Sequence, residues 1–307
     1  MDPLLKKLTI AIPLHNEGDY LESTIRSCVG QAGKILLCDN ASDDGSSAIC
    51  QKYAEEYPDV VEHIRHDTDI GAFENFQRPM FECQTPYFCW LGGHDKMGEN
   101  YGVTLVRALE NDAEAVLACG IIQHIDEQDK ELPRKTLSTF LNKDNETPLD
   151  RVEQLARSLR DCFIFYGVYR LDALRRAWYD KACLGTDRIV LFRLAGEGRF
   201  IFDQGCTLFA RDFPKKRDSR KDKERRSKVL VEASSRPLAK SNFERNRELI
   251  NATLVHANND ATLSHALRIV DIIRRRHHER RQQQKIRLIA VGAALMALLV
   301  LGWICLT

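Results

Sequence analysis

Apolar residues in the first 125 positions occur in short runs that alternate with segments of helical spacing. The runs predict five strands, because each is nearly continuous and is bounded by polar or turn-forming residues. These strands cover residues 7–14, 34–39, 60–66, 87–93 and 115–125. Helically spaced apolar residues predict helices at 20–29, 46–56, 71–83 and 98–111. The alternation predicts an α/β fold with a mostly parallel sheet and helices on both faces.

The pattern is less regular after the fifth strand. Residues 126–150 are polar and predict a loop-rich connection, whereas residues 149–161 predict an amphipathic helix. The apolar run that follows turns at Gly167, and residues 185–202 predict a loop, a helix and a strand. Helical spacing returns at 229–287 with few breakers, which predicts two or three further helices.

The end of the chain differs from the rest in composition. Residues 288–306 are 19 consecutive positions without a charge, about the length that crosses a bilayer. Residues 274–287 are rich in arginine, which favours the cytoplasmic side and anionic headgroups. The pattern predicts a single-pass membrane protein with its body in the cytoplasm, at the inner membrane in a bacterium. A buried C-terminal helix is the alternative.

Charge also divides the chain. Residues 1–210 carry 23 Lys+Arg and 34 Asp+Glu, whereas residues 211–307 carry 22 and 10, so their net charges are −11 and +12. An acidic body is therefore followed by a basic tail. Residues 211–228 have too few apolar side chains to pack, so they form either a solvated mobile segment or a flap over a phosphate.

Cysteines and missing motifs argue against several classes of protein. The ten cysteines include no Cys-x-x-Cys pair, which argues against a zinc ribbon or a redox dithiol and for buried free thiols in a reducing compartment. No Gly-x-Gly-x-x-Gly follows the first strand, and there is no Walker loop and no Gly-x-Ser-x-Gly elbow.

Polar and acidic residues directly follow four of the predicted strands. In an open parallel sheet, ligands gather at the carboxyl ends of the strands, so these side chains are expected to share a cleft. They are His15, Asn16 and Glu17; Asp39, Asn40, Asp43 and Asp44; His66, Asp67 and Asp69; and His94 and Asp95. Such oxygen ligands suit Mg²⁺ or Mn²⁺, which neutralises a departing diphosphate. Chance placement of acids in surface loops is the alternative.

These residues lie in segments that resemble family 2 inverting glycosyltransferases with the GT-A fold, which is Rossmann-like. "IAIPLHNEGDYLESTIRSCVGQ" and "KILLCDNASDDGS" are similar to that family's opening: a strand ending in Pro-x-x-Asn-Glu, a helix, and a strand ending in Asp. "HDTDIGAFENF" resembles its glycine-and-asparagine segment, and "LGGHDKM" falls at its Asp-x-Asp-type metal motif. "GTDRIVLFRLAGEGRF" resembles the segment with the acidic base. The resemblance covers about residues 7–205.

The resemblance implies a role for each matching residue. Residues implied to bind the nucleotide sugar are Pro13, Asn16, Glu17, Asp39, Gly71, Asn75 and His94. Asp39 would accept a hydrogen bond from the base. Asp95 would ligate the metal on the diphosphate, and Asp187 would deprotonate the acceptor hydroxyl. The structural alternatives are turn residues for Asp39 and Asp95, and a helix N-cap for Asp187.

The chain departs from the family's pattern at two positions. Glu74 stands where the family often has arginine, and His94 stands where many members have another acid. These departures leave open a catalytically inactive relative that acts as a tail-anchored binding or scaffold protein. A nucleotidyltransferase is expected to have a Gly-rich loop with Arg or Lys after the first strand. The segment "HNEGD" is not such a loop, which argues against this class. No Gln-x-x-Arg-Trp motif occurs, so a single transfer fits better than processive synthesis.

The sequence therefore predicts a membrane-anchored, metal-dependent glycosyltransferase. It would move a sugar from a nucleotide-diphosphate sugar, foremost a UDP-sugar, to a hydroxyl of a glycan or lipid-linked acceptor, with inversion and with no nucleic-acid partner. The expected parts are a catalytic domain at 1–210, split into a nucleotide-binding half (1–125) and an acceptor half (126–210), a basic helical juxtamembrane region at 211–287, and a transmembrane helix at 288–306.

Overall fold

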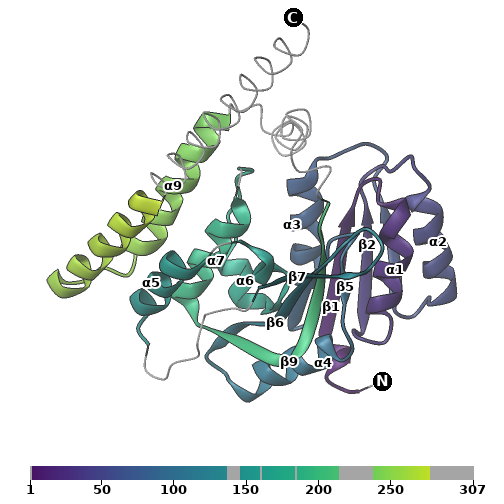
Figure 1. Ribbon diagram of the computed structural model, residues 1–307, viewed down its shortest axis with the longest axis horizontal. Helices are drawn as coiled ribbons and strands as arrows, with labels where there is room; N and C mark the ends of the chain where they lie inside the picture. The colour runs from purple at the N-terminus through teal and green to yellow at the C-terminus, as the bar shows by residue number, and fades with distance from the viewer. Residues whose placement is uncertain (1, 137–145, 160, 184, 214–237, 277–307) are drawn as a thin grey trace, which may run out of the picture.

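The computed structural model describes residues 2–136, 146–159, 161–183, 185–213 and 238–276. Within them, nine strands form one sheet: β1 (Leu8–Leu14), β2 (Lys34–Asp39), β3 (Val61–Arg65), β4 (Tyr87–Trp90), β5 (Lys96–Met97), β6 (Ala115–Ile125), β7 (Glu131–Thr136), β8 (Val168–Arg170) and β9 (Arg199–Arg211). The strand order is β3-β2-β1-β4-β8-β6-β9-β5, and β7 pairs with β6 outside this path (Figure 1).

Helices cover both faces of the sheet. They are α1 (Gly18–Cys28), α2 (Ser46–Glu56), α3 (Ala72–Glu82), α4 (Tyr101–Asn111), α5 (Pro148–Ser158), α6 (Leu171–Ala177), α7 (Thr186–Glu197) and α9 (Leu238–Leu254), with 3-10 turns η1 (Leu5–Lys7) and η2 (Phe163–Tyr166). Successive side chains of β1 point to opposite faces. Ile10 and Ile12 lie in a core with α1, α2 and α4, whereas Ala11 lies in a second core with α3, α5, α6 and α7.

The predicted strands and helices of the first 125 residues are confirmed to within a few residues, but the sheet is mixed. β1 runs parallel to β2 and β4, and β6 runs parallel to β9. β8 enters between β4 and β6 and is antiparallel to both. A Cβ on Gly167 would lie 2.5 Å from the Ala118 carbonyl oxygen, so a glycine is needed where the chain passes β6 to enter the sheet. The expectation of a mostly parallel sheet missed this inserted strand.

The predicted loop at 126–150 contains a strand instead. β7 pairs antiparallel with β6, and the turn that joins them is closed by a hydrogen bond from Asp126 N to Lys130 O (2.9 Å). Asp129 takes the left-handed conformation in this turn, with φ 64°. β7 pairs only with β6 among the described strands, so its polar sequence lacks the apolar pattern that marks the buried strands.

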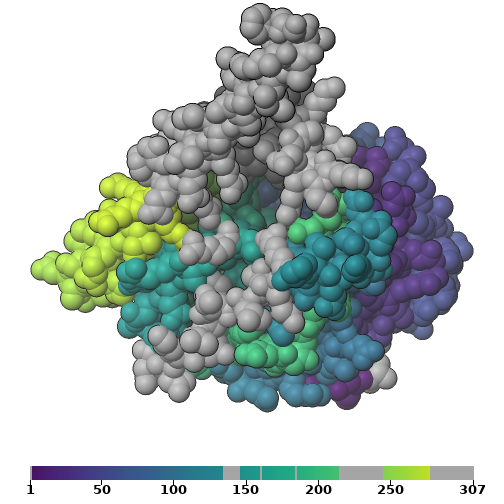
Figure 2. Space-filling view, viewed as in Figure 1, coloured from purple at the N-terminus to yellow at the C-terminus, as the bar shows by residue number. Residues whose placement is uncertain are grey.

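The C-terminal helices pack on the α5 and α7 side of the molecule. Glu248 of α9 lies 3.3 Å from the Arg193 guanidinium, and His265, in helical residues 260–276, lies 2.5 Å from Glu153. In the view of Figures 1 and 2, these helices are at the opposite end from α1 and α2. The two helices agree with the prediction for 229–287.

Membrane and redox predictions have different outcomes. Across the described ranges, no helix has the length and apolar character required to span a membrane. The predicted span at 288–306 and most of the basic segment at 211–228 lie outside those ranges. The cysteines that the structure describes are free thiols and, apart from Cys162, buried, as predicted.

Candidate active site

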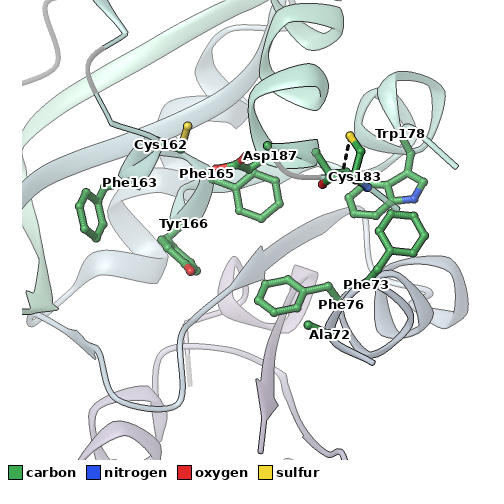
Figure 3. A pocket seen from close by; sticks show the side chains of 12 residues that line it. Ala72, Phe73, Phe76, Cys162, Phe163, Phe165, Tyr166, Trp178, Cys183 and Asp187 are labelled. Atoms are coloured by element: carbon green, nitrogen blue, oxygen red, sulfur yellow. Dashed lines mark hydrogen bonds between the residues drawn. The ribbon is translucent and has the colours of Figure 1, made fainter. Parts of the chain in front are cut away.

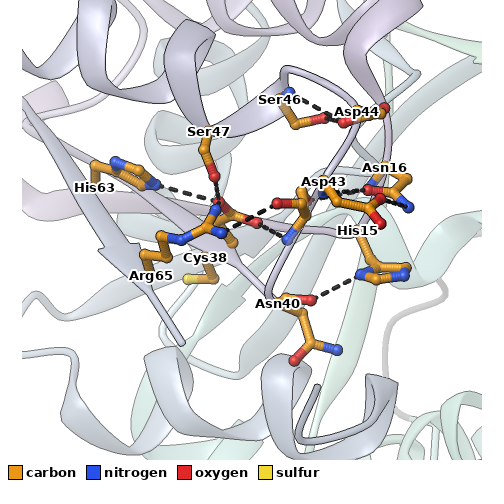
Figure 4. Close-up of polar contacts among 12 residues, drawn as sticks. His15, Asn16, Cys38, Asn40, Asp43, Asp44, Ser46, Ser47, His63 and Arg65 are labelled. Carbon is orange, nitrogen blue, oxygen red and sulfur yellow. Dashed lines mark hydrogen bonds and ion pairs between the residues drawn. The ribbon is translucent and has the colours of Figure 1, made fainter. Parts of the chain in front are cut away.

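Side-chain hydrogen bonds join the loops after β1 and β2 into one unit (Figure 4). Pro13 pairs in register with Cys38 near the end of the two strands. Asn16 follows with φ 59°, and its side-chain amide donates to Asp43 Oδ1 (2.8 Å) and accepts from Asp43 N (2.9 Å). Asp44 accepts from Gly18 N (2.9 Å) at the start of α1. Asp43 and Asp44 are therefore turn and cap residues, and Asp43 holds Asn16 in place.

Asp39 ends β2, is fully buried, and is bonded through both of its oxygens. Oδ1 accepts from Ser42 N (2.9 Å), while Oδ2 accepts from the Ser47 hydroxyl and from Arg65 Nη1 (2.7 Å). His63 Nε2 lies 3.5 Å from Oδ2. Burial by itself raises the pKa of Asp39, but the contacts with His63, Ser42 and Ser47 outweigh it and hold the pKa well below its ordinary value. The carboxylate therefore stays ionised inside the fold.

Gly71 is the N-cap of α3, and Asn75 joins this helix to β2. Gly71 has φ 81° and ψ 154°, a conformation that is essentially restricted to glycine, and its N–H donates to Asp69 Oδ1 (2.8 Å). Asn75 is buried, and its Nδ2 donates to the Cys38 carbonyl (2.9 Å). Asn75 Oδ1 has no hydrogen-bond partner among the described residues. Asn75 thus fixes α3 against the sheet, and its side-chain oxygen accepts no hydrogen bond from a described residue.

His94 and Asp95 lie beside Glu17. His94 Nδ1 is 3.1 Å from Glu17 Oε1; burial lowers the pKa of His94, but the bond to Glu17 and the charge of Asp95 raise it overall. Asp95 is buried, which raises its pKa against the opposing effect of His94 and Arg211. A Cβ on Gly92 would lie 2.8 Å from Asp95 Oδ2, so this glycine makes room for the acid itself.

Arg211 is a site residue that the sequence did not single out. It is the last residue of β9, its side chain is only 1% exposed, and its backbone N–H donates to Asp95 Oδ1 (2.8 Å). Its guanidinium donates to His94 O (2.9 Å), Asp126 O (2.6 Å) and Asp129, and lies 4.6 Å from the centre of the Tyr20 ring. It therefore fixes the segment that carries His94 and Asp95. In the sequence, Arg211 is the first residue of a basic run, which hides its buried position.

Asp187 lies on the wall of a pocket of about 420 Å³ (Figure 3). It is the second residue of α7, whose N-cap is Gly185 with φ 89°, so the N-cap alternative for Asp187 is wrong. Its Oδ1 accepts from Arg188 N (2.8 Å). Most of the pocket wall is aromatic, from Phe73, Phe76, Phe163, Phe165, Tyr166 and Trp178.

Tyr166 lines the same pocket as Asp187. Burial raises its pKa far above the ordinary value, and the negative charges of Asp95 and Asp187 raise it further. Its phenol therefore stays protonated and is a hydrogen-bond donor on the pocket wall. Tyr166 stands in an apolar aromatic run, where the pattern predicts only a core residue, so the sequence carries no signal for this position.

The possible metal ligands in this site fit only one type of metal site. Among the residues that the structure describes, no three His, Cys, Asp or Glu side chains form a group able to hold a metal ion. Asp95 Oδ2 receives no hydrogen bond from a described residue, while Oδ1 is fixed by Arg211 N. Mg²⁺ is commonly held by one or two carboxylates together with substrate phosphates. Asp95 therefore fits a cation shared with a bound diphosphate and does not fit a closed protein cage.

The comparisons with known proteins agree with this geometry. Residues 9–178, more than half of the chain, match the family described as "Glycosyl transferase family 2". The chain belongs to this family, as the sequence predicted. Its mixed α/β fold also matches solved structures with a GT-A-like architecture.

Three curated relatives match parts of the chain. Abequosyltransferase RfbV of Salmonella typhimurium is 23% identical over 200 residues, which cover 58% of this chain and 57% of that protein. The uncharacterized glycosyltransferase YibD of Escherichia coli is 30% identical over 110 residues, 34% of this chain and 31% of that protein. Cholesterol galactosyltransferase of Borreliella burgdorferi is 29% identical over 112 residues, 36% and 30%. The chain thus spans between about a third and just over half of these relatives.

Two solved structures show the likeness of fold. TarS 1–349 of S. aureus, in complex with UDP-GlcNAc, has a TM-score of 0.64 and 12% identity, over 89% of this chain and 72% of that one. GalNAc-T7 with UDP, GalNAc and Mn²⁺ has a TM-score of 0.51 and 14% identity, over 69% and 45%. At these identities the likeness establishes the fold alone.

Proposed function

We propose that the chain is a glycosyltransferase of class EC 2.4 that moves a sugar from a nucleotide-diphosphate sugar to a hydroxyl acceptor. The main support is the position of Asp187 on the wall of a pocket that Tyr166 also lines. Family membership supports the same reaction. A UDP-sugar is the proposed donor, because similar folds have been solved with UDP-GlcNAc and with UDP.

In the proposed reaction, Asp187 accepts the proton of the acceptor hydroxyl as that oxygen attacks the anomeric carbon. The bond from this carbon to the diphosphate oxygen breaks, and its electron pair leaves with the nucleoside diphosphate. Attack on the face opposite to the leaving group inverts the anomeric centre. The protonated Tyr166 would donate a hydrogen bond to a ligand in the pocket.

The donor would lie along the ends of β1 and β2, beside Pro13, Asn16 and Glu17. Asp39, which stays ionised at the end of β2, is the carboxylate proposed to accept a hydrogen bond from a base N–H. On the α3 side, the open Asn75 Oδ1 would accept from the donor.

Two further properties extend the proposal. When bound, a divalent cation, Mn²⁺ or Mg²⁺, neutralises charge on the diphosphate leaving group, and Asp95 is the residue that would hold it. We also propose attachment to the cytoplasmic face of a membrane, from the uncharged residues 288–306 and the arginines before them. There the site would meet a glycan or lipid-linked acceptor.

Donor binding tests the proposal directly. The chain would be titrated with UDP-, GDP- and other nucleotide sugars, each with and without Mn²⁺, and followed by thermal unfolding. One donor should raise the melting temperature, and more so with the metal. If no nucleotide sugar shifts the melting temperature under any condition, the enzyme proposal fails and the inactive binding protein becomes the better account.

A further inference from the structure

The pocket beside Asp187 has unusually few polar groups for a site that handles sugars. Its walls come from α3, from η2 and from the segment between α6 and α7 (Figure 3). The Thr186 hydroxyl donates to Cys183 O (2.8 Å), and Trp178 Nε1 donates to Gln77 Oε1 (3.1 Å). These two polar groups are thus already engaged within the protein. Among the described lining residues, the polar side-chain groups left for a ligand are the phenol of Tyr166 and the carboxylate of Asp187, whose Oδ1 also accepts from Arg188 N.

The small number of polar groups among these aromatic rings disfavours a ligand with many hydroxyls. Each buried hydroxyl that finds no partner costs about 1–3 kcal/mol, so a sugar with several hydroxyls would bind poorly among these rings. A ligand with a single hydroxyl would satisfy Asp187 and bury the rest of its surface against aromatic carbon. A volume of about 420 Å³ suits a compact ring system.

The aromatic wall is held in place by Trp90, which is fully buried at the end of β4. The Trp90 ring stacks on Phe165, with centroids 4.8 Å apart and planes 10° apart, and lies 5.6 Å from Trp178 and 6.3 Å from Phe76. Its Nε1 donates to the Phe76 carbonyl (2.9 Å). The wall is therefore ordered before a ligand arrives, which lowers the entropic cost of binding.

We propose that this pocket is the acceptor subsite, and that it takes a compact, mostly apolar ring system carrying one hydroxyl that points to Asp187. This inference rests on the proposed function for the role of Asp187. The polar groups suited to a nucleotide diphosphate lie elsewhere, at the ends of β1, β2 and β4. The pocket thus determines the class of acceptor, and the strand ends bind the donor.

Binding of two probe alcohols tests the inference without requiring turnover. The probes are decahydro-2-naphthol, an apolar bicyclic ring with a single hydroxyl, and myo-inositol, a ring that is hydroxylated at every carbon. Each is titrated calorimetrically into the full chain saturated with UDP. The bicyclic alcohol should bind at least about tenfold more tightly. Equal affinities, tighter binding of inositol, or no binding of either probe would overturn the inference.

Variants show whether the bicyclic alcohol binds in this pocket or on another apolar surface. Ala72→Leu adds bulk at the pocket wall and should weaken binding of the bicyclic alcohol about tenfold while UDP binds as before. Phe76→Ala removes part of the wall and should have a similar effect. Phe81→Ala is the matched control, because Phe81 lies on the same helix, is 49% exposed and does not line the pocket. An unchanged affinity in Ala72→Leu would contradict the assignment.

A competition experiment distinguishes acceptor from donor. If the pocket is the acceptor subsite, the alcohol binds together with an unreactive nucleotide sugar. If the nucleotide sugar displaces the alcohol while UDP does not, the pocket holds a deoxygenated donor sugar, and the inference is wrong. If no nucleotide binds but the alcohol does, the preference of the pocket for an apolar ring is supported, whereas the proposed function and the acceptor role fail.

Discussion

The two halves of the candidate site handle polar groups in opposite ways. At the ends of β1 and β2, side chains bond one another, so that Asn16 is fixed by Asp43 and Asp39 by Arg65. In the pocket, Asp187 stands on a wall made mostly of aromatic rings. The polar half is therefore rigid before a ligand binds, and it suits a constant partner such as a nucleotide. Under the proposed assignment, the aromatic half would recognise its ligand by shape and by one hydroxyl.

The two buried acids of the polar half, Asp39 and Asp95, differ in the direction in which their pKa is shifted. Hydrogen bonds keep the pKa of Asp39 low in spite of burial, whereas burial raises the pKa of Asp95 and only one hydrogen bond reaches it from the described residues. Ionised Asp39 therefore contributes to stability, and ionised Asp95 costs free energy that a bound cation would recover. The predictions below test these contrasts.

The largest effect of any variant is expected from Asp187→Asn, and it is an effect on the rate of sugar transfer. Loss of a general base should lower kcat by about 10²–10⁴-fold, while the Kd of the nucleotide sugar stays within about twofold because Asp187 lies in the other half. Single-turnover kinetics and donor titration measure the two quantities. Asp180→Asn, at an exposed position before α7, is the control. Retention of transfer in Asp187→Asn would show that the base is another residue.

Asp39→Asn should give the next largest effect, on stability. The change removes the charge that faces Arg65 and leaves the Ser47 hydroxyl and the Ser42 N–H with a weaker acceptor. Because Asp39 is fully buried and Arg65 is half-exposed, we expect a loss of about 2–3 kcal/mol in the free energy of unfolding. Urea unfolding at pH 7 measures it, with the exposed Asp59→Asn as control. A loss similar to that of the control would mean that the network around Asp39 is not stabilising.

The contribution of Asp39 should also depend on pH with a definite sign. Its pKa in the folded chain lies below the value of about 3.9 expected in the unfolded chain. The stabilisation is therefore complete above about pH 4 and is lost as the pH falls toward the folded pKa. The difference in unfolding free energy between the natural chain and Asp39→Asn should be constant from pH 7 to pH 5 and should shrink below pH 4. A difference that grows on acidification would contradict the assignment.

The spacing of apolar residues predicts many of the strands and helices. It also predicts where the polar residues at the ends of these strands lie. Strands β1 to β4 are buried, so their residues are apolar in sequence, and their ends put Asn16, Asp39 and Asp95 on one edge of the sheet. Local patterning carries this information because each of these residues lies at the end of its own strand or within five positions after it.

The parts that the sequence missed depend on contacts between distant segments. Arg211 binds the His94 carbonyl, 117 positions away, and no local pattern distinguishes it from the arginines and lysines that follow. The raised pKa of Tyr166 comes from burial and from Asp95 and Asp187, which lie on distant segments, and β7 is polar because it pairs at the margin of the sheet. Local sequence predicts elements and their ends, whereas these roles arise only from packing.

Gly71 joins the two halves, and Gly71→Ala should cost about 2 kcal/mol in unfolding free energy. The residue takes φ 81° and ψ 154° between the Asp69 turn and the α3 residues of the pocket, a region that alanine strongly disfavours. Chemical denaturation measures the cost, and donor affinity should fall as well if α3 shifts. A loss below about 0.5 kcal/mol would show that the backbone relaxes at this position.

Asp95→Asn should have the smallest effect on stability, and it tests the contrast with Asp39 most directly. Burial raises the folded pKa of Asp95 above its unfolded value, so the ionised group costs free energy that increases as the pH rises through these pKa values. Asparagine removes this cost and keeps an oxygen for the Arg211 N–H. The unfolding free energy at pH 7 should therefore change by less than about 1 kcal/mol, in the stabilising direction, and the gain should vanish near pH 3. A destabilisation as large as that of Asp39→Asn would mean that Asp95 is a structural acid, and its proposed role as a metal ligand would lose its physical basis.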